Sequence, residues 1–235
     1  MQPMAQTALA VGATLVALAF SMSAFERWLA RRRPHELAWS VALVLFALAS
    51  AALAAGAAGG WNEPLFRLFY LFGAVANVPV LALGTVYLLA PRRADWWAAA
   101  VALFVAFAAG VLTIAPFTGA VPVHRLPQGS EVFGPLPRVL AAVASAGGAS
   151  VVLGGAVWSA WRFRWGRMLW ANVLIALGTM VTGASGILNS VLGEMAAFSV
   201  TLAVGITIIF AGFLVATAVP TPARPHLQPV RDRAS

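Results

Sequence analysis

Cysteine and lysine are both missing from this sequence of 235 residues. Without cysteine, the chain has no disulfide bonds, no thiolate metal sites and no cysteine nucleophile. Without lysine, it has no side-chain amine that could form a Schiff base with retinal or pyridoxal phosphate. All fifteen basic residues are arginines, and abundant alanine and arginine without lysine are typical of a high-GC bacterial genome.

Charged residues of any kind are scarce. Only 9% of the residues are charged and 61% are hydrophobic, whereas a soluble domain typically has about 25% charged residues. So little charge cannot give a globule of this size a water-compatible surface. The net charge of +8 lies at the ends of apolar segments, where it sets membrane topology rather than binding nucleic acid. We therefore expect an all-α polytopic protein of the bacterial plasma membrane, with the lipid bilayer as its main partner.

Seven stretches of the sequence are long enough to cross a membrane as helices, which requires about 20 apolar residues. They cover residues 5–25, 37–57, 64–89, 94–116, 136–160, 168–190 and 195–219. No basic residue precedes the first stretch, so we interpret it as an uncleaved anchor rather than a signal peptide. The sequence predicts a seven-helix transmembrane domain over residues 1–219 and a disordered basic cytoplasmic tail over residues 220–235.

The arginines predict the orientation of the seven helices. Twelve of the fifteen follow the first, third, fifth or seventh stretch, and the other three are Arg67, Arg125 and Arg138. Because basic residues concentrate on the cytoplasmic side of a membrane, the arginine-rich side is predicted to face the cytoplasm. The N-terminus is then outside and the C-terminus is inside.

Ionisable residues are absent from the middle of the seven stretches, since each one lies at or beyond a predicted membrane boundary. This pattern argues against a proton pump with a buried carboxylate relay and against a haem subunit with histidine ligands. His35, His124 and His226 lie in separate loops and tails, without metal-ligand spacing. No serine in these stretches has a histidine at membrane depth to activate it. We therefore expect a non-enzymatic protein with no metal and no cofactor.

The third stretch combines small and polar residues on one predicted helix face. The residues on this face are spaced by three or four positions. They are Tyr70, Gly73, Asn77, Val80, Gly84 and Tyr87. Pro79 cannot donate a hydrogen bond to the carbonyl of Val75, so it is predicted to kink the helix. At mid-membrane depth, Asn77 either lines a ligand pocket or hydrogen-bonds a neighbouring helix and holds the bundle together.

Isolated polar residues lie at the predicted outer ends of several stretches. Glu63 and Arg67 are four residues apart, a spacing that suits a helical ion pair. Arg138 begins the fifth stretch, and Asn189 and Glu194 lie at the link between the sixth and the seventh. These residues either surround an outward-facing vestibule above Tyr70 and Asn77 or are solvated surface charges.

Small residues recur every fourth position along the fifth stretch. They are Ala142, Ala146, Ser150 and Gly154. A stripe of this kind allows another helix to approach closely. We interpret Ala146, Ser150 and Gly154 as helix-packing residues, with the partner either within the chain or in a second protomer.

One sequence resemblance rests on the third stretch and its flanks. The segments GW, FR-FYLFGA and LGT-YLLAPRR resemble a pattern found in uncharacterised seven-pass membrane proteins of high-GC bacteria. The resemblance implies a seven-pass topology, but it implies no activity.

Two functions are compatible with these residues. The first is an outward-facing polar pocket that binds or passes a small molecule, as a transporter or receptor does. In that pocket Tyr70 and Asn77 would form hydrogen bonds, Arg67 would anchor an anionic group, and Arg138, Asn189 and Glu194 would lie near the rim. The alternative is an interaction or assembly protein, such as an accessory subunit or sensor module, that joins a homo-oligomer or a membrane partner through helix–helix packing.

Overall fold

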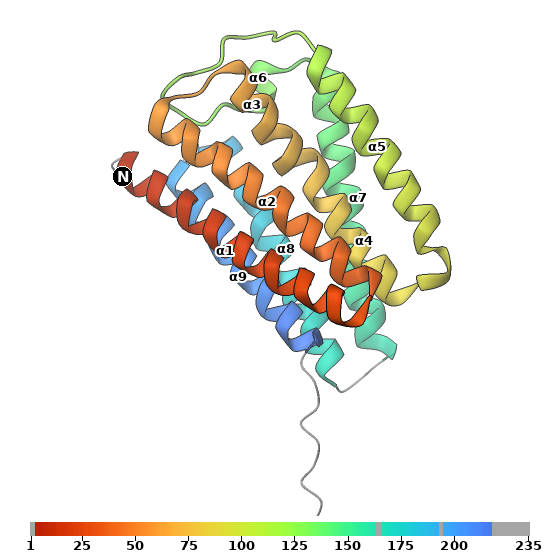
Figure 1. Ribbon diagram of the computed structural model, residues 1–235. Coiled ribbons are helices and arrows are strands. Elements are labelled where there is room, and N and C mark those ends of the chain that lie inside the picture. The colour runs from red at the N-terminus through yellow and green to blue at the C-terminus, as the bar shows by residue number, and fades with distance from the viewer. Residues whose placement is uncertain (1–2, 163–165, 193–194, 218–235) are drawn as a thin grey trace, which may run out of the picture.

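The computed structural model describes residues 3–162, 166–192 and 195–217 of the chain (Figure 1). Over these ranges the protein is all-helical, as the sequence predicts, and its single β-bridge pairs Phe117 with Phe133. The predicted tail over residues 220–235 lies outside the described residues.

The helices follow the predicted stretches closely. The first three are α1 (Pro3–Arg31), α2 (Pro34–Gly59) and α3 (Glu63–Phe69), and α3 continues through a π-helix, η1 (Tyr70–Ala76), into α4 (Asn77–Leu89). A 3-10 turn, η2 (Pro91–Arg93), then leads into α5 (Ala94–Ile114). The remaining helices are α6 (Gly129–Val132), α7 (Pro135–Arg162), α8 (Arg167–Leu192) and α9 (Met195–Thr217).

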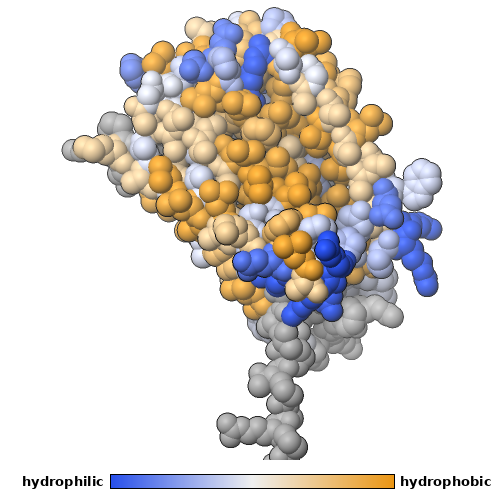
Figure 2. All heavy atoms as spheres, in the orientation of Figure 1, coloured by the Kyte–Doolittle hydropathy of each residue, from blue (hydrophilic) through white to orange (hydrophobic). Residues whose placement is uncertain are grey.

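Five helical segments are long and apolar enough to cross a membrane. They are Thr7–Arg31, Pro34–Gly59, Glu63–Leu89, Pro91–Ile114 and Pro135–Ser159. Figure 2 shows a broad apolar band across the visible face, with hydrophilic residues gathered at its two ends. A surface of this kind is stable in hydrocarbon and not in water. The chain is therefore a helical membrane protein.

Six helices form a closed ring. α1 packs on α2, α2 on α4, α4 on α7, α7 on α8, α8 on α9, and α9 returns to α1. α5 lies outside this ring, where it packs mainly against α4 and runs along the edge of the molecule in Figure 1. The interior of the ring is thus enclosed by helices that are far apart in the sequence.

The third predicted span differs from a simple proline kink. It is α-helical to Phe69, π-helical from Tyr70 to Ala76, and α-helical again from Asn77. Pro79 has no N–H that could donate to the carbonyl four residues earlier. In a π-helix each carbonyl accepts a hydrogen bond from the N–H five residues later, instead of four. The helix thus accommodates Pro79 by widening the turns before it. The hydroxyl of Ser145 on α7 donates to the carbonyl of Ala74 within this segment, at 3.2 Å.

The small residues of α7 that pack inside the bundle are not those of the predicted stripe. Ala146, Ser150 and Gly154 are exposed, and nothing in the described structure lies within 4 Å of a Cβ built on Gly154. Instead Gly148 packs against Val78, and Gly155 packs against Thr85. Val78 and Thr85 both belong to α4. The described residues therefore give no support to packing of the predicted stripe within the chain, and a partner in a second protomer stays a prediction. A helix with small residues on two faces can pack through either face. Here the face that carries Gly148 and Gly155, which are seven residues apart, packs against α4.

Candidate ligand cavity

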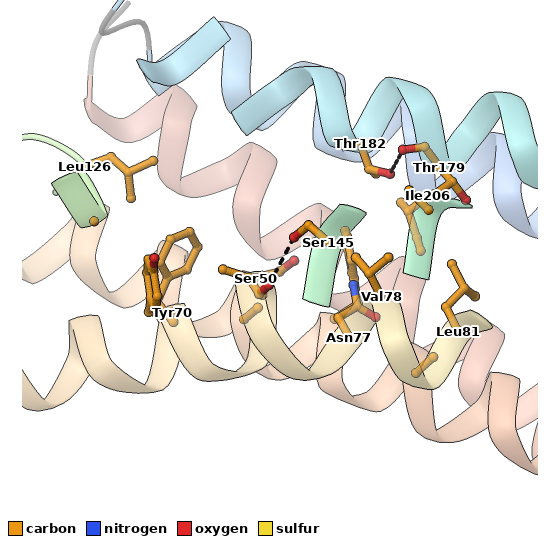
Figure 3. A pocket seen from close by; sticks show the side chains of 18 of the residues that line it. Ser50, Tyr70, Asn77, Val78, Leu81, Leu126, Ser145, Thr179, Thr182 and Ile206 are labelled. Carbon is orange, nitrogen blue, oxygen red and sulfur yellow. Dashed lines mark hydrogen bonds between the residues drawn. The ribbon is translucent and has the colours of Figure 1, made fainter. Parts of the chain in front are cut away.

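A cavity of about 440 Å³ lies within the helix ring. Its wall is formed by α2, the α3–η1–α4 segment, α7, α8, α9 and residues 126–130 of the connection before α7. Figure 3 shows the side chains of these elements converging on the same space. Ligand pockets typically measure about 300–1,000 Å³ and are mostly apolar with a few placed polar groups, which describes this cavity.

Three of the predicted ligand residues lie on the cavity wall: Tyr70, Asn77 and Arg138. Asn77 is half-buried, and no hydrogen bond joins its amide to the described part of the chain. A transmembrane amide that held two helices together would be bonded to the neighbouring helix. The polar groups of Asn77 are therefore free to meet whatever occupies the cavity.

The sequence interpretation missed Ser50 on α2. This serine lines the cavity, is fully buried, and its hydroxyl has no hydrogen-bond partner within the described structure. A buried hydroxyl without a partner is unfavourable, and here it lies within the wall of the cavity. Ser50 lies among alanines in a stretch of low polarity, and nothing in the sequence pattern distinguished it from a serine in a packed helix.

The hydroxyls of α8 behave differently, although two of them also line the cavity. Thr179 donates to the carbonyl of Ile175 at 2.7 Å, and Thr182 donates to the carbonyl of Gly178 at 2.8 Å. Both are bonds to the preceding turn of the same helix, as threonine commonly makes. These two residues therefore make a weaker case for ligand binding than Ser50 and Asn77.

One end of the cavity is bordered by the connection between α5 and α7. Gly129 packs so closely on the ring of Tyr70 that a Cβ at this position would lie 2.6 Å from Cε2. Ser130 and Arg138 line the same end and are exposed, so the cavity reaches the surface here. The backbone N–H of Thr118 donates to the carbonyl of Val132 at 2.9 Å, which fixes the two ends of the connection to each other.

An exposed ion pair further fixes this connection. Arg125 donates from Nη1 and Nη2 to the two carboxylate oxygens of Glu131, at 2.8 and 3.0 Å. This hydrogen bonding lowers the pKa of Glu131 below its usual value.

We expect acid to remove the small contribution of this ion pair to stability. The pKa of Glu131 is lower in the folded protein than in the unfolded protein. The ion pair therefore stabilises the fold fully at a pH above the pKa that Glu131 has in the unfolded protein. This stabilisation is lost as the pH falls through the pKa that Glu131 has in the folded protein. Thermal unfolding at decreasing pH should show Arg125→Gln less stable than wild type near neutral pH, with the difference vanishing once Glu131 is protonated. A difference that persists in acid would contradict this role. Arg92→Gln, which removes another exposed arginine, is the control.

Arg67 does not lie at the cavity, in contrast to its predicted role as an anchor for an anionic group. Its guanidinium donates to the carbonyls of Leu112 and, at 2.8 Å, Ala115, and it lies over the ring of Phe117 at 4.2 Å. Leu112 lies in the last turn of α5 and Ala115 caps its end, where a cation is stabilised by unpaired backbone acceptors. The expected ion pair between Glu63 and Arg67 is also wrong, because Arg67 turns towards α5.

The predicted rim is described only in part. The side chain of Asn189 and the whole of Glu194 lie outside the described residues. The cavity wall therefore includes one predicted rim residue, Arg138, together with Gln128 and Ser130 of the connection, which the sequence interpretation did not single out.

Glu36 on α2 is a second feature that the sequence did not reveal. It lies next to a predicted membrane boundary, at the start of α2, and the residue is fully buried. Neither carboxylate oxygen has a hydrogen-bond partner in the part of the chain that is described. The nearby Arg27 donates to Ser23 Oγ at 2.8 Å. Glu36 is not among the residues that line the cavity, so it takes no part in the site.

The described residues contain no group of three or more histidine, aspartate or glutamate side chains that could hold a metal ion. No known protein family, curated protein or solved structure matches the chain. The resemblance of the third span to seven-pass proteins of high-GC bacteria therefore stays a prediction.

Proposed function

We propose that this protein is a non-enzymatic membrane protein of the bacterial plasma membrane that binds or passes a small molecule through its central cavity. In this proposal α8 and α9 complete a set of seven spans, with the N-terminus outside and the C-terminus in the cytoplasm. The arginine distribution supports this orientation. The cavity then opens to the outside, because its exposed end is formed by the connection that follows α5.

The unpaired amide of Asn77 carries the proposal. It lies on the wall of a cavity of about 440 Å³, at a depth where an unsatisfied polar group is costly in lipid. Ser50, on the facing helix α2, adds a buried hydroxyl that has no hydrogen-bond partner among the described residues. Two unpaired polar side chains in an apolar chamber are typical of a binding site whose ligand supplies the missing partners.

Filling the cavity tests this proposal. Ala149 lines the cavity from α7, whereas Ala146 on the same helix is exposed on its outer side. A panel of medium-chain alkanols, alkylamides and methyl esters would be screened for thermal stabilisation of the purified full chain. We expect compounds that stabilise wild type and Ala146→Trp to lose their effect on Ala149→Trp, because tryptophan occupies the chamber.

Two results of the screen would contradict the proposal. In the first, no compound of the panel stabilises the wild type and no anionic amphiphile binds it. In the second, the compounds stabilise Ala149→Trp as strongly as Ala146→Trp, which would place their binding elsewhere on the molecule. Asn77→Leu provides a finer comparison: the alkylamides should lose about tenfold in affinity, which corresponds to one buried hydrogen bond of about 1.4 kcal/mol.

A second candidate function is assembly with another protomer or a membrane partner. The observation that favours it is the exposure of Ala146, Ser150 and Gly154, which are not used for packing within the described chain. Small residues facing lipid allow the backbone of another helix to approach.

A further inference from the structure

We propose that the ligand of the cavity is an amphipathic anion, whose charged group binds Arg138 and whose apolar part occupies the chamber below it. This inference rests on the proposed function and specifies its substrate class. In this inference Arg138 is the residue that binds the anionic group. Arg67, which was expected to do so, is hydrogen-bonded to the end of α5.

The charge of the cavity favours an anion. Among the described residues that line it, Arg138 is the only charged side chain. Arg125 forms an ion pair with Glu131, so the carboxylate of the neighbouring connection is already neutralised. Arg138 has no ion pair or hydrogen bond to the described residues. A guanidinium at the mouth of a low-dielectric chamber attracts anions and repels cations.

The shape and lining of the chamber favour an apolar body. Its deeper wall contains Leu43, Phe46, Leu81, Ile206 and Ile209, from α2, α4 and α9. Figure 3 shows Leu81 and Ile206 at the end of the space away from Tyr70 and Leu126. Hydrocarbon buried against these side chains is removed from water, which gives a favourable contribution proportional to its area.

The two halves of the cavity together select the ligand class. A small inorganic anion would leave the apolar half empty, and a plain hydrocarbon would leave Arg138, Asn77 and Ser50 without partners. A molecule with an anionic head and an apolar chain or ring satisfies both halves. Such a molecule comes either from the bilayer, as a single-chain fatty carboxylate, or from the aqueous phase, as a small organic acid.

A matched pair of probes tests this inference. Radiolabelled decanoate and 1-decanol share an apolar chain and differ in charge at a pH well above the carboxyl pKa. Each is added to the full chain in phosphatidylcholine nanodiscs. Specific binding is the amount of probe bound by wild type minus the amount bound by Ala149→Trp. This subtraction removes the probe that partitions into lipid. We expect decanoate to bind about tenfold more tightly than decanol, as one charge-assisted hydrogen bond implies.

Arg138→Gln should abolish this preference by weakening decanoate about tenfold and leaving decanol unchanged. Arg92→Gln, which removes an exposed arginine that does not line the cavity, should retain the preference. Increasing salt should weaken decanoate binding and not decanol binding, because the mouth is exposed and its charge is screened. Phenylacetate, which is water-soluble, distinguishes the sources: binding of phenylacetate indicates an aqueous acid, and binding of decanoate alone indicates a ligand from the bilayer.

The failure of this inference can be distinguished from the failure of the proposed function. Equal binding of decanoate and decanol, or a preference that survives Arg138→Gln, would overturn the anionic ligand and leave the cavity as a site for neutral molecules. An absence of specific binding for all the probes, together with no stabilisation by the neutral panel, would overturn both.

Discussion

Gly178→Leu is expected to lower the stability of the bundle by about 3 kcal/mol, the largest loss that we predict for a single substitution. Gly178 lies at a close approach of α8 and α9: a Cβ built there would be 2.7 Å from the carbonyl oxygen of Gly205 and 2.7 Å from the backbone nitrogen of Ile209. Both contacts are with backbone atoms, which cannot rotate away as a side chain can. A leucine must therefore separate the two helices.

Thermal unfolding of the purified protein in detergent measures this effect. Gly154→Leu is the matched control, because the same change occurs on α7 at a position with open space around it. We expect the control to differ from wild type by less than about 0.5 kcal/mol. Equal loss in both variants would show that α8 and α9 do not approach at Gly178. A change in oligomeric state caused by Gly154→Leu, without loss of stability, would favour the assembly function.

Much of the fold could be predicted because hydrocarbon thickness imposes a length on each helix. Runs of apolar residues were enough to locate α1, α2, α5 and the α3–η1–α4 segment. The spacing of Tyr70 and Asn77 was enough to place both on one helix face. These features depend on the local sequence alone, which is why they could be predicted.

Features that depend on distant segments could not be predicted. Arg67 binds carbonyls that are more than forty positions later in the chain, and no local pattern shows where α5 will end relative to α3. The exposed stripe with Gly154 and the packed face with Gly148 look alike in the sequence, and only the position of α4 decides between them. Ser50 and Glu36 became informative through their burial, which depends on the whole ring.

The pocket also changes how the third span is understood. From the sequence, Pro79 predicted a kink that frees a carbonyl near Asn77. In the structure the π-helical turns over Tyr70–Ala76 widen the helix instead. A π segment alters the rotation of the side chains along a helix and is often found at functional sites. Here it lies along the cavity, where Tyr70, Gly73 and Ala74 all contribute to the wall.

Cysteine labelling at Ser145 and Ser150 provides the most direct test of a cavity that opens to the outside. Both serines lie on α7, but Ser145 lines the cavity and Ser150 is exposed on the outer side of the ring. The chain has no cysteine of its own, so Ser145→Cys and Ser150→Cys each introduce a single thiol. A thiol must ionise to react, and an apolar environment suppresses the thiolate.

The reagent is an impermeant anionic thiosulfonate, which is added to intact cells. We predict that Ser145→Cys reacts about 100-fold faster than Ser150→Cys, which corresponds to a difference of about two pKa units between a hydrated and a lipid-facing thiol. Adding Ala149→Trp should slow the reaction at Ser145→Cys to the rate at Ser150→Cys. If Ser145→Cys is as unreactive as Ser150→Cys, or reacts only when the reagent reaches the cytoplasm, then the cavity does not open to the outside and the proposed function is wrong.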